Sequence, residues 1–177
     1  MHSFQYRKRQ LYALFTLRVF IGWYFLYEGL SKLLTPNWSA YGYLIDSKGV
    51  FAPLFVQLAG NAALLDVVNI VNAWGLTLVG LSLIMGLFTR VGYLSGILFL
   101  LVFYLSHPPL LHTEYILPRE GSYLWIDKNL IMLAAIVVLM LFPTSRIIGF
   151  DSLLFRKKNH RVGSVMARNI LQHSTRK

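Results

Sequence analysis

The sequence predicts an all-α integral membrane protein built as a bundle of four transmembrane helices. Hydrophobic residues make up 56% and charged residues 14% of the 177 residues, whereas soluble domains average about 45–50% and about 25%. The mean hydropathy is +0.55. A soluble domain of this size would expose large apolar patches, so we expect the helices to lie in lipid.

Four apolar segments have the length and composition of membrane spans. The second contains no charged residue across residues 67–88, and at about 1.5 Å per residue it crosses a hydrocarbon core of roughly 30 Å. Pro108 and Pro143 end the third and fourth segments because proline does not continue a helix. The predicted spans lie near residues 11–34, 67–88, 91–107 and 123–142.

A further apolar segment, residues 50–65, lies between the first two spans. Pro53 and Gly60 interrupt it, and a fifth crossing would place the two basic ends of the chain on opposite sides of the membrane. We therefore expect this segment to form an interfacial or re-entrant helix.

The distribution of basic residues predicts the orientation. Twelve lysine and arginine residues flank the helices on the side of the two termini, whereas the opposite loops hold only Lys48 and Arg119. The positive-inside rule then places both termini in the cytoplasm, with the helices in the bacterial inner membrane. We expect residues 1–145 to form the membrane domain and residues 146–177 a basic cytoplasmic tail. This arrangement leaves no basic face for nucleic acid.

The first predicted helix carries charges at membrane depth. Arg18, Gly22, Gly29 and Lys32 share one helical face, and Glu28 precedes Lys32 by four residues, the favourable order for an ion pair. The glycines permit close approach of a neighbouring helix. Because a charge in the bilayer is costly, an interior functional site is one interpretation. The alternative is that the two cations snorkel to the headgroup layers.

Other candidate site residues lie on the later helices and in the outer loop. Asn72 suits either a ligand contact or a hydrogen bond between helices, and the aromatic residues suit either a ligand wall or an interfacial belt. His107 belongs to the residue type that titrates near neutral pH. Lys32 and Lys128 would make a cationic rim for a small anion. The predicted substrate- or quinone-binding residues are Asn72, Trp74, Tyr104, Glu120, Lys128 and Asn129.

Several kinds of chemistry are not expected. The sequence has no cysteine, which removes disulfides, cysteine nucleophiles and thiolate metal sites. The histidine and glutamate residues of the outer loop match no metal-binding spacing, and there is no nucleotide-binding motif. We therefore predict neither a metal nor a nucleotide cofactor.

The chain resembles the DoxX family, in particular its DoxD branch, the large subunit of thiosulfate:quinone oxidoreductase. The resemblance rests on the segments RVFIGWYFLYEGLSKLL (18–34), VNAWGLTLVGLSLIMGLFTR (71–90) and EGSYLWIDKNLIMLAA (120–135). It implies a four-helix membrane protein that passes electrons from thiosulfate to quinone together with a small partner subunit. Met132 is a departure, because the family often has a glutamate near this position.

Three functions are consistent with these observations. The first is a membrane subunit of a quinone-linked oxidoreductase, with Arg18, Glu28, Lys32 and His107 as its catalytic residues and quinone as electron acceptor. The second is a non-catalytic assembly or anchoring subunit of a redox complex. The third is a small proton-coupled transporter that uses Glu28. The expected partners are the lipid bilayer and either a small subunit or further copies of the chain.

Overall fold

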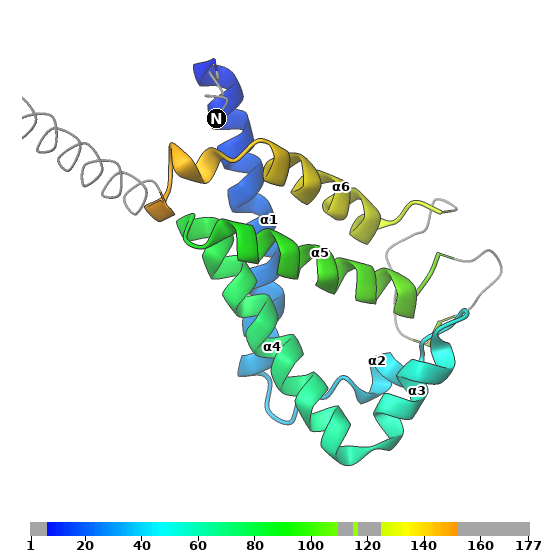
Figure 1. Ribbon diagram of the computed structural model, residues 1–177. Coiled ribbons are helices and arrows are strands. Elements are labelled where there is room, and N and C mark those ends of the chain that lie inside the picture. The colour runs from blue at the N-terminus through cyan, green and yellow to red at the C-terminus, as the bar shows by residue number, and fades with distance from the viewer. Residues whose placement is uncertain (1–6, 110–114, 117–124, 152–177) are drawn as a thin grey trace, which may run out of the picture.

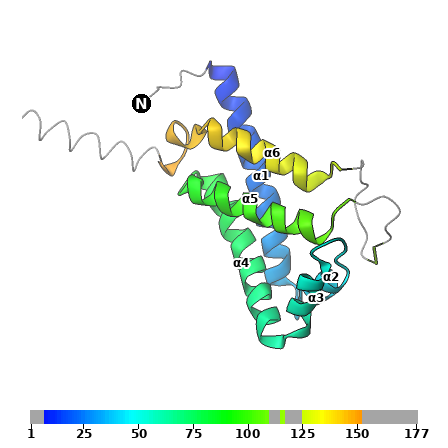
Figure 2. The same ribbon diagram turned by 45° about the vertical axis from the view of Figure 1, so that its right-hand side comes forward.

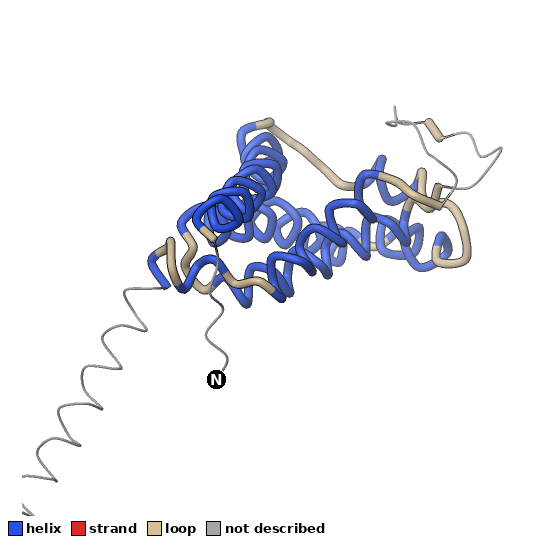
Figure 3. Tube along the Cα trace, turned by 90° about the horizontal axis from the view of Figure 1, so that it is seen from above, coloured by secondary structure: helices blue, strands red, loops and turns tan. Residues whose placement is uncertain are grey.

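The computed structural model describes residues 7–109, 115–116 and 125–151, and every regular element among them is helical (Figure 3). The predicted all-α class is therefore confirmed. The elements are α1 (Lys8–Leu34), α2 (Tyr41–Ile45), α3 (Ala52–Gly60), α4 (Ala62–Met85), α5 (Thr89–Ser106), α6 (Lys128–Leu141) and the short 3-10 helix η1 (Thr144–Arg146).

Two helices, α4 and α5, are long and apolar enough to cross a membrane. They correspond to the second and third predicted spans. Helix α1 has 27 residues and carries the three charges noted above, and α6 has 14 residues. The presence of membrane-spanning helices thus agrees with the sequence, and the count of four spans stays a prediction.

Helix α6 begins later than the sequence predicts. Trp125 and Ile126 lie before the helix, and residues 123–124 are outside the described residues. The cause is Asp127, whose backbone is extended and whose side chain accepts a 2.9 Å hydrogen bond from the Leu130 N–H. An aspartate at this position satisfies a backbone donor of the first helical turn and so fixes where the helix starts.

The apolar segment between the first two predicted spans forms α3 and the start of α4. The break falls at Asn61, whose side chain accepts a 3.2 Å hydrogen bond from the Leu64 N–H and caps α4. Residues 62–65 therefore belong to α4. The predicted intervening helix is present, although it is shorter than expected, and its depth in the membrane stays a prediction.

Glycines bring α1 and α4 into backbone contact. A Cβ atom added at Gly29 would collide with the backbone of Thr77, and one added at Gly80 would collide with the backbone of Leu26. The two helices make the most extensive contact in the described fold. The small-residue face predicted on the first helix is therefore its packing surface against α4.

A single apolar core joins the four long helices. Helices α5 and α6 lie side by side and pack across α1 and α4 (Figures 1 and 2). The buried core residues are Ile21, Phe25, Leu76, Val79, Leu83, Tyr93, Leu100, Ile136 and Leu139.

Helices α4 and α5 form a V whose apex is the turn Gly86–Phe88. Gly86 and Phe88 both have left-handed backbone conformations, with φ values of 66° and 51°. The helices diverge away from this turn, and α2 and α3 lie between their far ends (Figure 1). We call the end with the turn and residues 142–151 the tail end, and the end with α2 and α3 the loop end.

Candidate functional site

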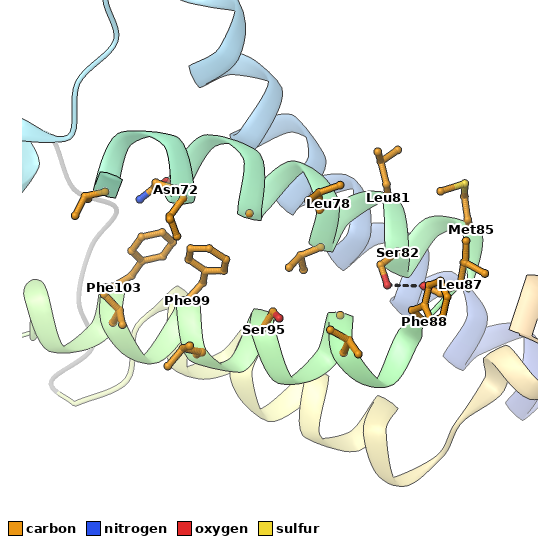
Figure 4. A pocket seen from close by; sticks show the side chains of 18 of the residues that line it. Asn72, Leu78, Leu81, Ser82, Met85, Leu87, Phe88, Ser95, Phe99 and Phe103 are labelled. Carbon is orange, nitrogen blue, oxygen red and sulfur yellow. Dashed lines mark hydrogen bonds between the residues drawn. The ribbon is translucent and has the colours of Figure 1, made fainter. Parts of the chain in front are cut away.

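The most prominent candidate site is a groove in the V between α4 and α5. It has a volume of about 810 Å³ and runs from Phe88 at the tail end to Val67 and Phe103 at the loop end (Figure 4). Its walls are almost entirely aliphatic and aromatic. The polar side chains that line it are Asn72, Ser82 and Ser95.

Asn72 is the polar residue of this groove whose side-chain acceptor atom makes no hydrogen bond. Its side-chain Oδ1 atom is buried and has no hydrogen-bond partner. By contrast, the Ser82 hydroxyl donates a 2.7 Å hydrogen bond to the Leu87 carbonyl. An unsatisfied buried polar atom costs about 1–3 kcal/mol, and a ligand would recover this energy once the Asn72 amide turns its oxygen into the groove, because protein atoms enclose that oxygen in the structure.

Aromatic rings stand beside Asn72. Phe99 and Phe103 extend from α5 into the groove near the amide, with ring centroids 6.1 Å apart (Figure 4). These two residues were not predicted from the sequence, although their spacing of four on an apolar helix is a weak signal for a shared face. They supply the aromatic wall that the sequence assigned to other residues.

The aromatic residues predicted from the sequence lie elsewhere. Trp74 is on α4 but outside the groove, with 55% of its surface exposed. The Tyr104 hydroxyl donates a 2.9 Å hydrogen bond to the Trp125 carbonyl and also lies outside the groove. Neither residue therefore supplies the predicted ligand wall, and Trp74 lies near the middle of α4 instead of at an end, where a residue of an interfacial belt is expected.

Arg18 is fully buried, and therefore it does not snorkel. Its guanidinium donates a 3.2 Å hydrogen bond to Thr144 Oγ1 and a 2.8 Å hydrogen bond to the Ile148 carbonyl. It also lies 5.2 Å from the centre of the Phe15 ring. The side chain points inward, as the interior interpretation predicted, but it binds the protein's own tail end and does not line the groove.

The tail end is further fixed by Asp151. Its carboxylate accepts hydrogen bonds from the Phe88 N–H at 2.9 Å and the Thr89 N–H at 3.3 Å, and its own N–H donates to the Gly86 carbonyl at 2.8 Å. The apex of the V is therefore attached to the segment that follows α6.

Glu28 and Lys32 form the predicted ion pair, with Lys32 Nζ 2.8 Å from Glu28 Oε2. Lys128 lies over the ring of Tyr24, one helical turn before Glu28, with its Nζ 5.3 Å from the ring centre. The two predicted rim lysines thus both contact the same face of α1. Asn129 donates a 2.9 Å hydrogen bond to Asp127 Oδ2 beside the start of α6.

His107 lies in a buried cluster at the loop end. Its ring is stacked on Tyr43 at 4.0 Å and on Tyr115 at 5.1 Å, and its Nδ1 atom is 3.0 Å from Ser106 Oγ. Its Nε2 atom is 4.0 Å from Asp46 Oδ2. The sequence analysis did not predict Asp46 as a partner, because no spacing links residues so far apart in the chain.

One predicted binding residue cannot be placed, and the structure also bears on metal binding. Glu120 is outside the described residues. Within the part of the chain that the structure describes, no group of three or more histidine, cysteine, aspartate or glutamate side chains is placed to hold a metal ion.

The helical fold, the two apolar spans and the apolar lining of the groove together indicate a helical membrane protein. The chain belongs to the DoxX family, whose model matches residues 13–108. This match covers most of α1 and all of α2 to α5, including both walls of the groove, and it ends before α6. No curated protein and no solved structure matches the chain.

Proposed function

We propose that this DoxX protein is the membrane subunit of a quinone-linked oxidoreductase and that the groove between α4 and α5 binds the quinone. The observation that carries the proposal is the apolar groove with the unsatisfied Asn72 acceptor at its loop end. A prenylated quinone has the matching chemistry, because it combines a long apolar chain with a flat ring that bears polar oxygens.

The groove suits both parts of such a molecule. Its volume of about 810 Å³ lies within the roughly 300–1,000 Å³ of small-molecule sites. Phe99 and Phe103 offer ring faces for offset stacking on the head. The Asn72 amide can donate to a quinone carbonyl through Nδ2 or, after its side chain turns, accept from a quinol hydroxyl through Oδ1.

The proposed reaction passes electrons from a small sulfur anion to the quinone. In the form that the DoxD resemblance implies, two thiosulfate ions lose one electron each and join into tetrathionate, while the quinone takes up two electrons and two protons and becomes quinol. Lys32 and Lys128 would attract the anion. Electron transfer between anion and quinone would need a small partner subunit or a second copy of the chain.

The proposed setting is the bacterial inner membrane, crossed by α1, α4, α5 and α6 with both termini in the cytoplasm. Arg18 supports this topology, because its contacts with Thr144 and Ile148 bring the amino-terminal half of α1 to the end of the bundle where α6 ends. That placement supports an even number of crossings.

A second candidate function is a non-catalytic assembly subunit. It is favoured by Arg18, which the sequence analysis assigned to catalysis and which instead binds protein groups at the tail end. The transporter hypothesis is weaker, because the Glu28 carboxylate that it needs is held by Lys32.

Quinone binding to the chain in lipid nanodiscs tests the proposal. We expect decylubiquinone or a menaquinone analogue to bind, and Ser95→Phe to abolish binding because the new ring fills the groove. Leu94→Phe is the matched control, since Leu94 is the adjacent residue on α5 but does not line the groove. Asn72→Leu should weaken binding by about three- to tenfold, the value of one hydrogen bond.

A second assay separates the two candidate functions. Thiosulfate and quinone are added to the protein with and without co-purifying subunits, and quinone absorbance is followed. Turnover that Ser95→Phe abolishes supports the oxidoreductase. If stoichiometric partner proteins co-purify and turnover is equally fast with the Ser95→Phe variant, the chain is an assembly subunit. If the chain binds no quinone, the proposed site is overturned.

A further inference from the structure

Helices α2 and α3 form a bridge between the diverging ends of α4 and α5. On the α4 side, the Ala40 N–H donates a 2.8 Å hydrogen bond to Asn69 Oδ1. Val68, which lines the groove, packs against the buried cluster that contains Leu44 and Phe55. The bridge is therefore attached directly to one wall of the groove at its loop end.

The bridge is attached to the opposite wall as well. Tyr43 of α2 meets Phe103 edge-on, with ring centroids 6.1 Å apart, and Phe103 lines the groove. The Lys48 N–H donates a 3.1 Å hydrogen bond to the Ser106 carbonyl, and Gly49 lies against Pro108. The separation of α4 and α5 at the loop end thus depends on this connection.

A carboxylate and an imidazole meet at the centre of the second attachment. Asp46 and His107 are 1% and 5% exposed, and their closest polar atoms are 4.0 Å apart. Asp46 Oδ1 also accepts a 3.1 Å hydrogen bond from the Ile116 N–H. The imidazole also contacts the two stacked tyrosines and the Ser106 hydroxyl, which are uncharged at neutral pH.

The strength of this contact depends on the protonation state of His107. A protonated imidazole is strongly attracted to a buried carboxylate 4.0 Å away, whereas a neutral imidazole is attracted to it much more weakly. An ordinary histidine changes state near pH 6.5.

We propose that Asp46 and His107 form a proton-dependent lock between the α2–α3 bridge and α5, which sets the width of the groove at its loop end. The lock is closed when His107 is protonated and loosens when it is neutral. Its effect on ligand retention rests on the proposed function of the groove: quinone is held more tightly at low pH on the side of the bridge.

The first test measures the width directly. Because the chain has no cysteine, Val56→Cys on α3 and Leu105→Cys on α5 introduce two exposed labelling sites without other changes. Spin labels at these sites report the distance between bridge and α5 in nanodiscs. We expect a narrow distance distribution at about pH 5 and a broader, longer one at about pH 8, on either side of histidine titration.

Two variants and one control identify the groups responsible. His107→Gln and Asp46→Asn should each remove the pH dependence of the distance. Tyr115→Phe keeps the ring that stacks on His107 and removes only the hydroxyl, which bonds the Pro108 carbonyl, so it should retain the pH dependence. A wild-type distance that does not change with pH overturns the lock.

Binding of decylubiquinone at the same two pH values tests the coupling. We expect roughly fivefold tighter binding at the lower pH in the wild type, the lower end of typical coupling between sites, and no difference in His107→Gln. Equal affinity at both pH values overturns the coupling while leaving the quinone site intact. A pH-dependent distance without any quinone binding supports the lock and overturns the proposed function instead.

Discussion

The carboxylate of Asp151 accepts a 2.8 Å hydrogen bond from the Thr89 hydroxyl and, through its bonds from the Phe88 and Thr89 N–H groups, caps the first turn of α5 from a position far along the chain. Phe88, the residue that precedes α5, provides no side-chain cap of its own. The apex of the V between α4 and α5 therefore depends on a residue that follows α6, and the tail end of the chain supports the groove.

Replacing Asp151 by alanine should destabilise the fold. The variant leaves the Phe88 and Thr89 N–H groups without their acceptor, and loss of a helix cap costs about 0.5–2 kcal/mol. Unfolding in detergent micelles, followed by far-ultraviolet circular dichroism, measures the change. Asp66→Ala is the control because Asp66 is an exposed aspartate on α4, and an equal loss in both variants would contradict the capping role.

Arg18→Lys should lower stability and leave quinone affinity unchanged. A lysine ammonium lacks the planar fork that reaches both Thr144 and Ile148, so at least one charged hydrogen bond is lost, worth about 1.5–3 kcal/mol. The same unfolding measurement applies. The control is Arg90→Lys, at an exposed arginine, which should change stability by less than about 0.5 kcal/mol.

Quinone binding by Arg18→Lys discriminates between a structural and a catalytic role for Arg18. A variant that is as stable as the wild type but no longer binds quinone would contradict the structural role and assign Arg18 to the ligand site.

Much of the helical framework could be predicted from the sequence, because the signals for it are local. The charge-free run that forms α4 and the glycines of α1 are visible within single segments. The position of Arg18 inside an apolar helix left both burial and snorkelling open, and the structure shows that the side chain is buried. Its partners could not be predicted, because Ile148 is 130 residues away and the contact depends on how α6 ends.

Gly80→Ala should separate α1 from α4. The added methyl group meets the Leu26 backbone, which cannot move as a side chain can, and overpacking of this kind costs about 1–3 kcal/mol. Gly60→Ala provides the control, since an added Cβ there meets nothing within 4 Å and should be neutral or slightly stabilising. Thermal unfolding of both variants in the same micelles makes the comparison, and equal behaviour would contradict the close backbone contact.

The groove and the buried cluster around His107 could not be predicted from the sequence, and the reason is physical. A groove arises from the divergence of two helices, which no residue type encodes, and the same apolar residues would be expected on any lipid-facing helix. Asn72 was predicted as a candidate, but only the structure distinguishes its unsatisfied oxygen from an ordinary bond between helices. Asp46 could not be paired with His107 before the bridge of α2 and α3 was known.

Glu28→Gln distinguishes the oxidoreductase from the transporter. The Glu28–Lys32 pair is of the helical i,i+4 type, so its loss should cost only about 0.3–0.5 kcal/mol. Lys32 also keeps its 3.2 Å hydrogen bond to the Glu28 carbonyl and its position over Trp38. We therefore expect nearly unchanged stability and quinone affinity, measured in nanodiscs, whereas Glu28→Lys should be less stable because two like charges then face each other.

The decisive comparison is proton-driven uptake into proteoliposomes. If the chain is a transporter that uses Glu28, the glutamine variant loses uptake completely, because a group that carries the proton has been removed. If the groove is the working site, Ser95→Phe is the inactive variant and Glu28→Gln retains quinone binding. The two substitutions therefore predict opposite patterns, since Glu28 lies on α1 and outside the residues that line the groove.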